Sequence, residues 1–179
     1  MGVSVVNLPP VVAQAAAAIA LGLLVASGIA KLVDPSPTTG AMRAAHLPSS
    51  NLASRLLGTV EVIVAGVSLV VGGAILWMAA ILYLAFAAFT FGATLKRIPV
   101  QSCGCFGRED TPPTGIHVVY NTGAFVALWS LAVTNTAPID WTTPMTEVLL
   151  YLGFTAIGVF TSYLLLARLP QLLQLTRSP

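Results

Sequence analysis

Residues 52–95 read LASRLLGTVEVIVAGVSLVVGGAILWMAAILYLAFAAFTFGATL and form the longest apolar segment of the chain. It is almost free of charge and too long for one membrane helix, because about 20 apolar residues cross a hydrocarbon layer about 30 Å thick. The pair Gly72–Gly73 interrupts it near the middle. Glycine reaches positive φ freely, so we expect a tight turn there. The sequence therefore predicts two membrane helices, at about Leu52–Val71 and Ala74–Leu95.

Three further apolar segments predict membrane helices at about Val11–Val33, Ile116–Thr134 and Met145–Leu169. Only 8% of the 179 residues are charged, whereas soluble domains have about 25%. A surface so poor in charge needs lipid as its solvent. No positive charge precedes the first apolar run, so we expect a retained helix and not a cleaved signal peptide. The fold class is therefore an all-α integral membrane protein with five spans.

The basic residues predict how the chain is oriented. Cytoplasmic loops of membrane proteins are enriched in Lys and Arg. With five spans, all eight basic residues lie on one side of the bilayer: Lys31, Arg43, Arg55, Lys96, Arg97, Arg108, Arg168 and Arg177. We expect a multi-pass protein of the plasma membrane, with the N-terminus outside and the C-terminus in the cytoplasm. The net charge is only +2 and there is no basic tract, so nucleic-acid binding has no support.

Segment 34–51 is the polar connection between the first two helices. Its sequence TGAMRAAHL, residues 39–47, suits a short interfacial helix that Pro48 would end. The residues SSN that follow offer an N-cap for the second span.

The loop 96–115, KRIPVQSCGCFGREDTPPTG, holds both cysteines of the chain, Cys103 and Cys105. Two thiols this close can form a disulfide after a local bend, with a flexible glycine between them. Such a bridge would be easily reduced, which suits an electron carrier. Two thiolates can also bind a soft metal ion such as Cu(I). The third alternative is that both cysteines are inert small residues.

Glu61 lies well inside the second predicted span, where an ionised carboxylate is costly and needs a partner or a cavity. Lys31 ends the first span on the same side, and its long side chain can reach inward, although the two residues differ in depth by more than an ideal pair. His117 and Asn121 on the fourth span are further candidate hydrogen-bond partners. Glu61 is either a proton acceptor coupled to thiol oxidation or part of a polar clamp between helices.

Four stretches of the sequence resemble the MauE branch of the DoxX-like membrane proteins. They are SGIAKLVDP at 27–35, LLGTVEVIVAGVSLVVGG at 56–73, SCGCFG at 102–107 and HVVYNTGAFVAL at 117–128. The resemblance implies a four-helix membrane core over residues 11–135, including the cysteine loop. The fifth span, residues 145–169, lies outside it, as do tails 1–10 and 170–179. The family's arginine before Asn121 is replaced by Tyr120.

The resemblance also implies a function. MauE is named for methylamine utilisation, where it supports production of a periplasmic dehydrogenase subunit rich in disulfides. By resemblance, Cys103 and Cys105 are the family's paired cysteines, and the chain passes electrons between thiols and disulfides with a thioredoxin-like partner or an envelope redox complex. The alternatives are a non-catalytic assembly factor and a thiolate metal-binding protein. No cofactor motif is present, and a quinone pocket has no sequence motif behind it.

Overall fold

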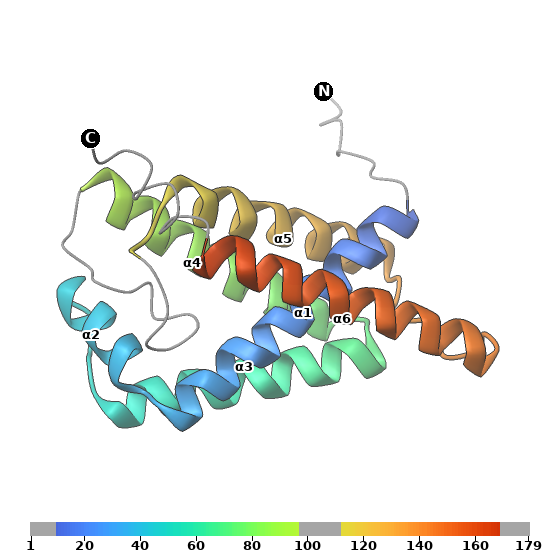
Figure 1. Ribbon diagram of the computed structural model, residues 1–179, viewed down its shortest axis with the longest axis horizontal. Coiled ribbons are helices and arrows are strands. Elements are labelled where there is room, and N and C mark those ends of the chain that lie inside the picture. The colour runs from blue at the N-terminus through green and yellow to red at the C-terminus, as the bar shows by residue number, and fades with distance from the viewer. Residues whose placement is uncertain (1–9, 97–111, 169–179) are drawn as a thin grey trace.

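The structure is a computed structural model that describes residues 10–96 and 112–168 (Figure 1). Five of its helices are long and apolar enough to cross a membrane, as the sequence predicts. The helices are α1 Pro10–Val33, α2 Ser36–Ala44, α3 Asn51–Val71, α4 Ile75–Leu95, α5 Gly115–Thr134 and α6 Met145–Ala167. Each long helix starts within one residue of its predicted start, and α6 ends two residues earlier than predicted.

Four of the long helices form a closed ring. Helix α1 packs against α3 and α5, and α4 packs against the same two helices from the other side. The buried centre is made of alanine and leucine side chains, among them Ala17, Leu21, Leu76 and Leu128. Across the ring, the Tyr83 hydroxyl of α4 donates to the backbone oxygen of Ala20 in α1 at 2.5 Å. This ring is the predicted four-helix core.

The outer surface of the bundle is apolar. Large hydrophobic side chains are exposed along the long helices, for example Ile63 of α3, Ile81 of α4 and Phe154 of α6. Exposed apolar surface of this extent is unfavourable in water and favourable in hydrocarbon. The surface therefore fits a lipid bilayer.

One end of the bundle gathers the segments that the sequence places on the basic side. Helix α2, the end of α4 and the start of α5 lie at this end in Figure 1, together with the end of α1 and the start of α3. Arg43, Arg55 and Lys96 belong to these segments. The structure thus agrees with the predicted alternation of the spans, while the assignment of this end to the cytoplasm stays a prediction.

One predicted turn and one predicted helix cap are present as the sequence indicates. Gly72 and Gly73 have φ values of +64° and +69° between α3 and α4. Ser50 caps α3, because its hydroxyl accepts a hydrogen bond from the backbone N–H of Ala53 at 3.0 Å. A serine in this position satisfies an N–H group that the helix itself leaves unpaired.

Helix α2 forms, but its ends differ from the prediction. It begins at Ser36, directly after Pro35, whose backbone is already helical. It ends at Ala44, well before Pro48, and His46 adopts a left-handed φ of +57°. The physical reason is that proline suits the first turn of a helix, whereas a left-handed residue ends it before a proline has to.

Helix α6 lies outside the ring and packs mainly on α1. Two glycines bring the helices close together. A Cβ atom on Gly22 of α1 would stand 2.5 Å from Cγ2 of Val159 in α6, and one on Gly158 would collide with the end of the Ile19 side chain. Most of the remaining surface of α6 is exposed, including Leu149, Ile157 and other large apolar side chains.

Candidate functional site

Lys31 of α1 and Glu61 of α3 form an ion pair inside the bundle. The Lys31 Nζ atom lies 3.0 Å from Oε2 of Glu61 and also donates to the hydroxyl of Ser27 at 2.5 Å. Lys31 is 3% exposed and Glu61 is fully buried. A buried charge needs a close partner, because taking it out of water costs several kcal/mol. The pair therefore gives each of these two buried charges an opposite charge in direct contact.

The helix crossing explains how the two residues meet. Gly28 and Gly58 lie against each other where α1 and α3 cross. A Cβ atom on Gly28 would stand 2.6 Å from the backbone oxygen of Gly58, and one on Gly58 would stand 2.7 Å from that of Gly28. Lys31 and Glu61 each follow one of these glycines by three residues, so each is one helical turn from the crossing.

The depth difference expected from the sequence does not prevent the contact. Side chains on a helix tilt toward its N-terminus. For Lys31 this direction leads from the end of α1 into the bundle, to the level of Ser27, one turn earlier. Its four-carbon chain therefore spans the distance to Glu61. The pairing of Lys31 with Glu61 that the sequence suggests therefore forms despite the difference in depth.

The surroundings of the pair are aromatic and apolar. The Lys31 ammonium lies 5.7 Å from the centre of the Phe86 ring of α4, within range of a cation–π interaction. Oε1 of Glu61 is buried and has no hydrogen-bond partner within residues 10–96 and 112–168. One oxygen of the carboxylate is thus held by Lys31, and the other is available as a hydrogen-bond acceptor. No pattern in the sequence indicates that Ser27 and Phe86 belong to this site.

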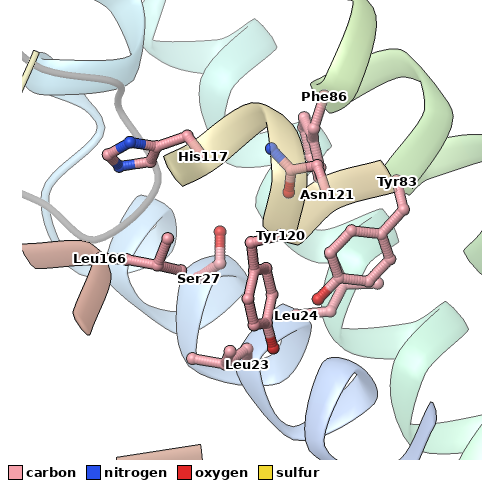
Figure 2. A pocket seen from close by; sticks show the side chains of 9 residues that line it. All are labelled: Leu23, Leu24, Ser27, Tyr83, Phe86, His117, Tyr120, Asn121 and Leu166. Carbon is pink, nitrogen blue, oxygen red and sulfur yellow. The ribbon is translucent and has the colours of Figure 1, made fainter. Parts of the chain in front are cut away.

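His117 and Asn121 line a small cavity beside the ion pair (Figure 2). Its volume is about 30 Å³, and a water molecule needs about 10–15 Å³ of such space. Ser27 from α1 and Tyr120 from α5 also face it. His117 lies in the first turn of α5 and is part of its cap. Its Nδ1 lies 3.3 Å from the backbone nitrogen of Thr114 and 3.0 Å from the Thr114 hydroxyl.

Ser27 connects the cavity to the ion pair, because it accepts the hydrogen bond from Lys31 and lines the cavity as well. The structure brings Lys31 and Glu61 into direct contact and places His117 and Asn121 around the adjoining cavity. Within residues 10–96 and 112–168, neither His117 nor Asn121 forms a hydrogen bond with Glu61.

Cys103 and Cys105, the predicted catalytic cysteines, lie outside the described residues. The helices that flank their loop are described, α4 ending at Leu95 and α5 beginning at Gly115. Both of these ends lie at the end of the bundle that carries α2 (Figure 1). Among the side chains in the described ranges, no group of three His, Cys, Asp or Glu residues is arranged to hold a metal ion.

A family model described as methylamine utilisation protein MauE matches residues 9–134. The chain belongs to the MauE family. The match covers α1 to α5, and it therefore includes the glycine crossing, the ion pair and the cysteine loop. Helix α6 lies outside it. No curated protein and no solved structure matches the chain.

Proposed function

We propose that this MauE protein carries electrons between thiols and disulfides in the membrane, through Cys103 and Cys105. The observation that carries the proposal is the Cys-Gly-Cys sequence between α4 and α5, inside the region matched by the family. A disulfide across so short a loop is strained and readily reduced, which favours exchange over a permanent structural bond. By accepting electrons from other thiols, the pair supports disulfide formation in, or the maturation of, an envelope protein.

Glu61 is the proposed proton acceptor for this reaction. When two thiols form one disulfide, two S–H bonds break, one S–S bond forms, and two electrons and two protons leave. The free Oε1 of Glu61 offers one buried site for a proton. Lys31 places a positive charge 3.0 Å from the other carboxylate oxygen, Oε2, and this contact favours the ionised form that accepts the proton. The cavity to which Ser27, His117 and Asn121 contribute polar groups extends this site toward the start of α5, where the cysteine loop ends.

Cys103 and Cys105 need a partner protein with which they exchange a disulfide. The proposed partner is a thioredoxin-like protein or an envelope redox complex. The family description connects the MauE proteins to methylamine utilisation. We include maturation of an enzyme of that pathway among the functions proposed for this chain. The proposed setting is the plasma membrane, with the N-terminus outside and the cysteine loop on the cytoplasmic side.

A second candidate function is that of an assembly factor without redox activity. The observation that favours it is that the ion pair and the glycine crossing join α1 to α3 without any contribution from the cysteines. In that function the polar residues serve as a clamp between helices, and Cys103 and Cys105 are dispensable.

Replacing the cysteines separates the two candidates. Cys103→Ser and Cys105→Ser, singly and together, should each leave envelope proteins with unpaired thiols, because a disulfide needs both sulfur atoms. The measurement is the thiol content of envelope proteins, labelled with a maleimide reagent and read as a shift on gels. Ser102→Ala is the matched control beside the pair. Normal disulfide content in the double variant, with the protein present at its usual level, would favour the assembly factor.

A further inference from the structure

A second, larger cleft is lined by Lys31 of the ion pair and lies between α2, α3 and α4. Its volume is about 220 Å³, and a buried apolar cavity of about 150 Å³ is already large enough to bind benzene. Leu57 of α3 and Leu82 of α4 form apolar walls, and Phe86 and Phe89 supply two aromatic rings. The cleft therefore has the size and the lining to hold a flat six-membered ring.

Lys31 is the charged residue of the cleft lining. Its ammonium group carries three N–H donors. One bonds to Ser27 and one to Glu61, and the third has no hydrogen-bond partner within the described residues. The side chain is 3% exposed. A buried donor is costly when unpaired, so a ligand in this cleft gains affinity from an acceptor atom directed at Lys31.

The cleft opens toward the lipid-facing side of α4. Ala85 lines it and is exposed. Its neighbours Ile81 and Leu84 are exposed large apolar side chains, on the surface that fits a bilayer. A ligand can therefore place its ring in the cleft while an attached hydrocarbon tail stays in the lipid. Phe89 and Thr90 also place the cleft close to the end of α4, which is followed by the cysteine loop.

We propose that this cleft binds the ring of a lipid-soluble quinone, with one quinone carbonyl accepting a hydrogen bond from Lys31. A quinone combines the features the cleft requires: a flat ring for the two phenylalanines, an acceptor oxygen for the third N–H, and a hydrocarbon tail. A lipid acyl chain would fill the apolar part but offers no acceptor to Lys31. Aromatic rings at such a site contribute through apolar contact and stacking.

The quinone also completes the electron balance of the proposed function, on which this step rests. Cys103 and Cys105 lose two electrons and two protons as their S–S bond forms. The quinone gains two electrons and two protons, and its two carbonyl groups become the hydroxyl groups of a hydroquinone. No other oxidant is needed. Binding of the quinone, in contrast, depends on the cleft and Lys31 alone.

The test measures binding of decylubiquinone to the full chain in detergent by isothermal titration. Ala85→Phe places a large side chain in the cleft and should weaken binding at least about tenfold. Ala88→Phe is the matched control, because Ala88 is exposed on the same helix and is not part of the cleft lining. Equal affinity for the two variants would overturn the proposal. So would equally tight binding of decylbenzene, which has the ring and the tail but no carbonyl oxygen, since it would identify a lipid groove.

Two further variants separate this inference from the redox function. The double variant Lys31→Met/Glu61→Gln removes both buried charges together and should bind decylubiquinone at least about tenfold more weakly, while its helix content, read by circular dichroism, is unchanged. The double variant Cys103→Ser/Cys105→Ser should bind it as tightly as the unaltered protein. If that cysteine variant binds normally while envelope disulfides are unaffected, the redox function fails and the quinone site stands. If the unaltered protein does not bind decylubiquinone, the quinone site fails and the redox function is tested separately by the envelope thiols.

Discussion

Two helix contacts of this protein use glycine for close approach, yet they bury very different groups. At the α1–α3 contact, Gly28 and Gly58 bring backbone against backbone, and the ion pair of Lys31 and Glu61 lies beside them. At the α1–α6 contact, Gly22 and Gly158 meet only the ends of apolar side chains.

The difference indicates what each contact does. An ion pair in an apolar interior fixes the position of two helices, because any displacement leaves a charge without its partner. Contact between apolar side chains in a bilayer has no such requirement, since lipid tails are equally good neighbours. The first contact also lies within the region that defines the MauE family, whereas α6 lies outside it. We therefore expect the α1–α3 contact to be rigid and the α1–α6 contact to tolerate change.

The largest effect is expected from Lys31→Met, which leaves Glu61 buried without its cation. Breaking a buried pair costs about 3–5 kcal/mol. The double variant Lys31→Met/Glu61→Gln should lose less, because no charge remains buried. Unfolding in a denaturing detergent titration, followed by circular dichroism, measures both. A double variant as unstable as the single one would show that the pair is not what holds α1 to α3.

The next largest effect is expected from Gly58→Ala. The added Cβ would lie 2.7 Å from the backbone oxygen of Gly28 and 2.9 Å from Cβ of Lys31, and neither atom can move without displacing a helix. Such overpacking costs about 1–3 kcal/mol. Gly66→Ala is the control in the same helix, because a Cβ atom there would meet no atom of a neighbouring segment within 4 Å. The same unfolding titration should show a lower stability for Gly58→Ala than for Gly66→Ala. Equal stability of the two variants would show that the glycine crossing does not require close contact.

A smaller loss is expected from Gly158→Ala in α6. The added Cβ meets Cδ1 and Cγ1 of the Ile19 side chain, which can turn away with a χ angle about 30° off its preferred value, at about 0.5–1.5 kcal/mol. Gly153→Ala is the control in the same helix, because a Cβ atom on Gly153 would meet no atom of a neighbouring segment within 4 Å. A loss for Gly158→Ala that exceeds the loss for Gly58→Ala would reverse the comparison between the two contacts.

The smallest effect is expected at the connection into α6. The hydroxyl and the backbone N–H of Thr142 donate to Asp140 Oδ1 at 2.6 Å and 2.9 Å, and these bonds hold the pKa of the Asp140 carboxyl below its usual value. Because the pKa is lower in the folded protein, the stabilisation is present above the pKa of the unfolded chain, at about 4. It is lost as the pH falls further.

Asp140→Asn keeps an acceptor oxygen but cannot titrate, so this part of the pH dependence should disappear. The measurement compares unfolding of the two proteins between about pH 3 and pH 6, a range that brackets the usual carboxyl pKa of about 4. An unchanged pH profile in the variant would contradict the assignment to Asp140.

Much of the fold follows from the sequence because its signals are local. Apolar length defines the five spans, Gly72–Gly73 supplies the turn after α3, and Ser50 supplies its cap. The end of α2 was misjudged because His46, and not Pro48, is where the chain leaves the helix.

The site was only partly predictable because it depends on contacts between distant segments. Glu61 and Lys31 are recognisable as charges in apolar spans. Their distance depends on where α1 and α3 cross, and the sequence does not state that Gly28 faces Gly58. The contribution of Phe86 and the cleft beside Lys31 also require α4 to be in place. No local sequence pattern indicates the Phe86 contact or the cleft.

The most direct test of the central claim is the redox state of Cys103 and Cys105 in living cells. Thiols are trapped with an alkylating reagent that crosses membranes, and in parallel with one that does not, and the labelled loop is identified by mass spectrometry. We expect a mixture of dithiol and intramolecular disulfide that moves toward the disulfide under an oxidant, with the dithiol labelled only by the reagent that crosses membranes. A pair that stays fully reduced under all conditions while the protein performs its task would contradict it.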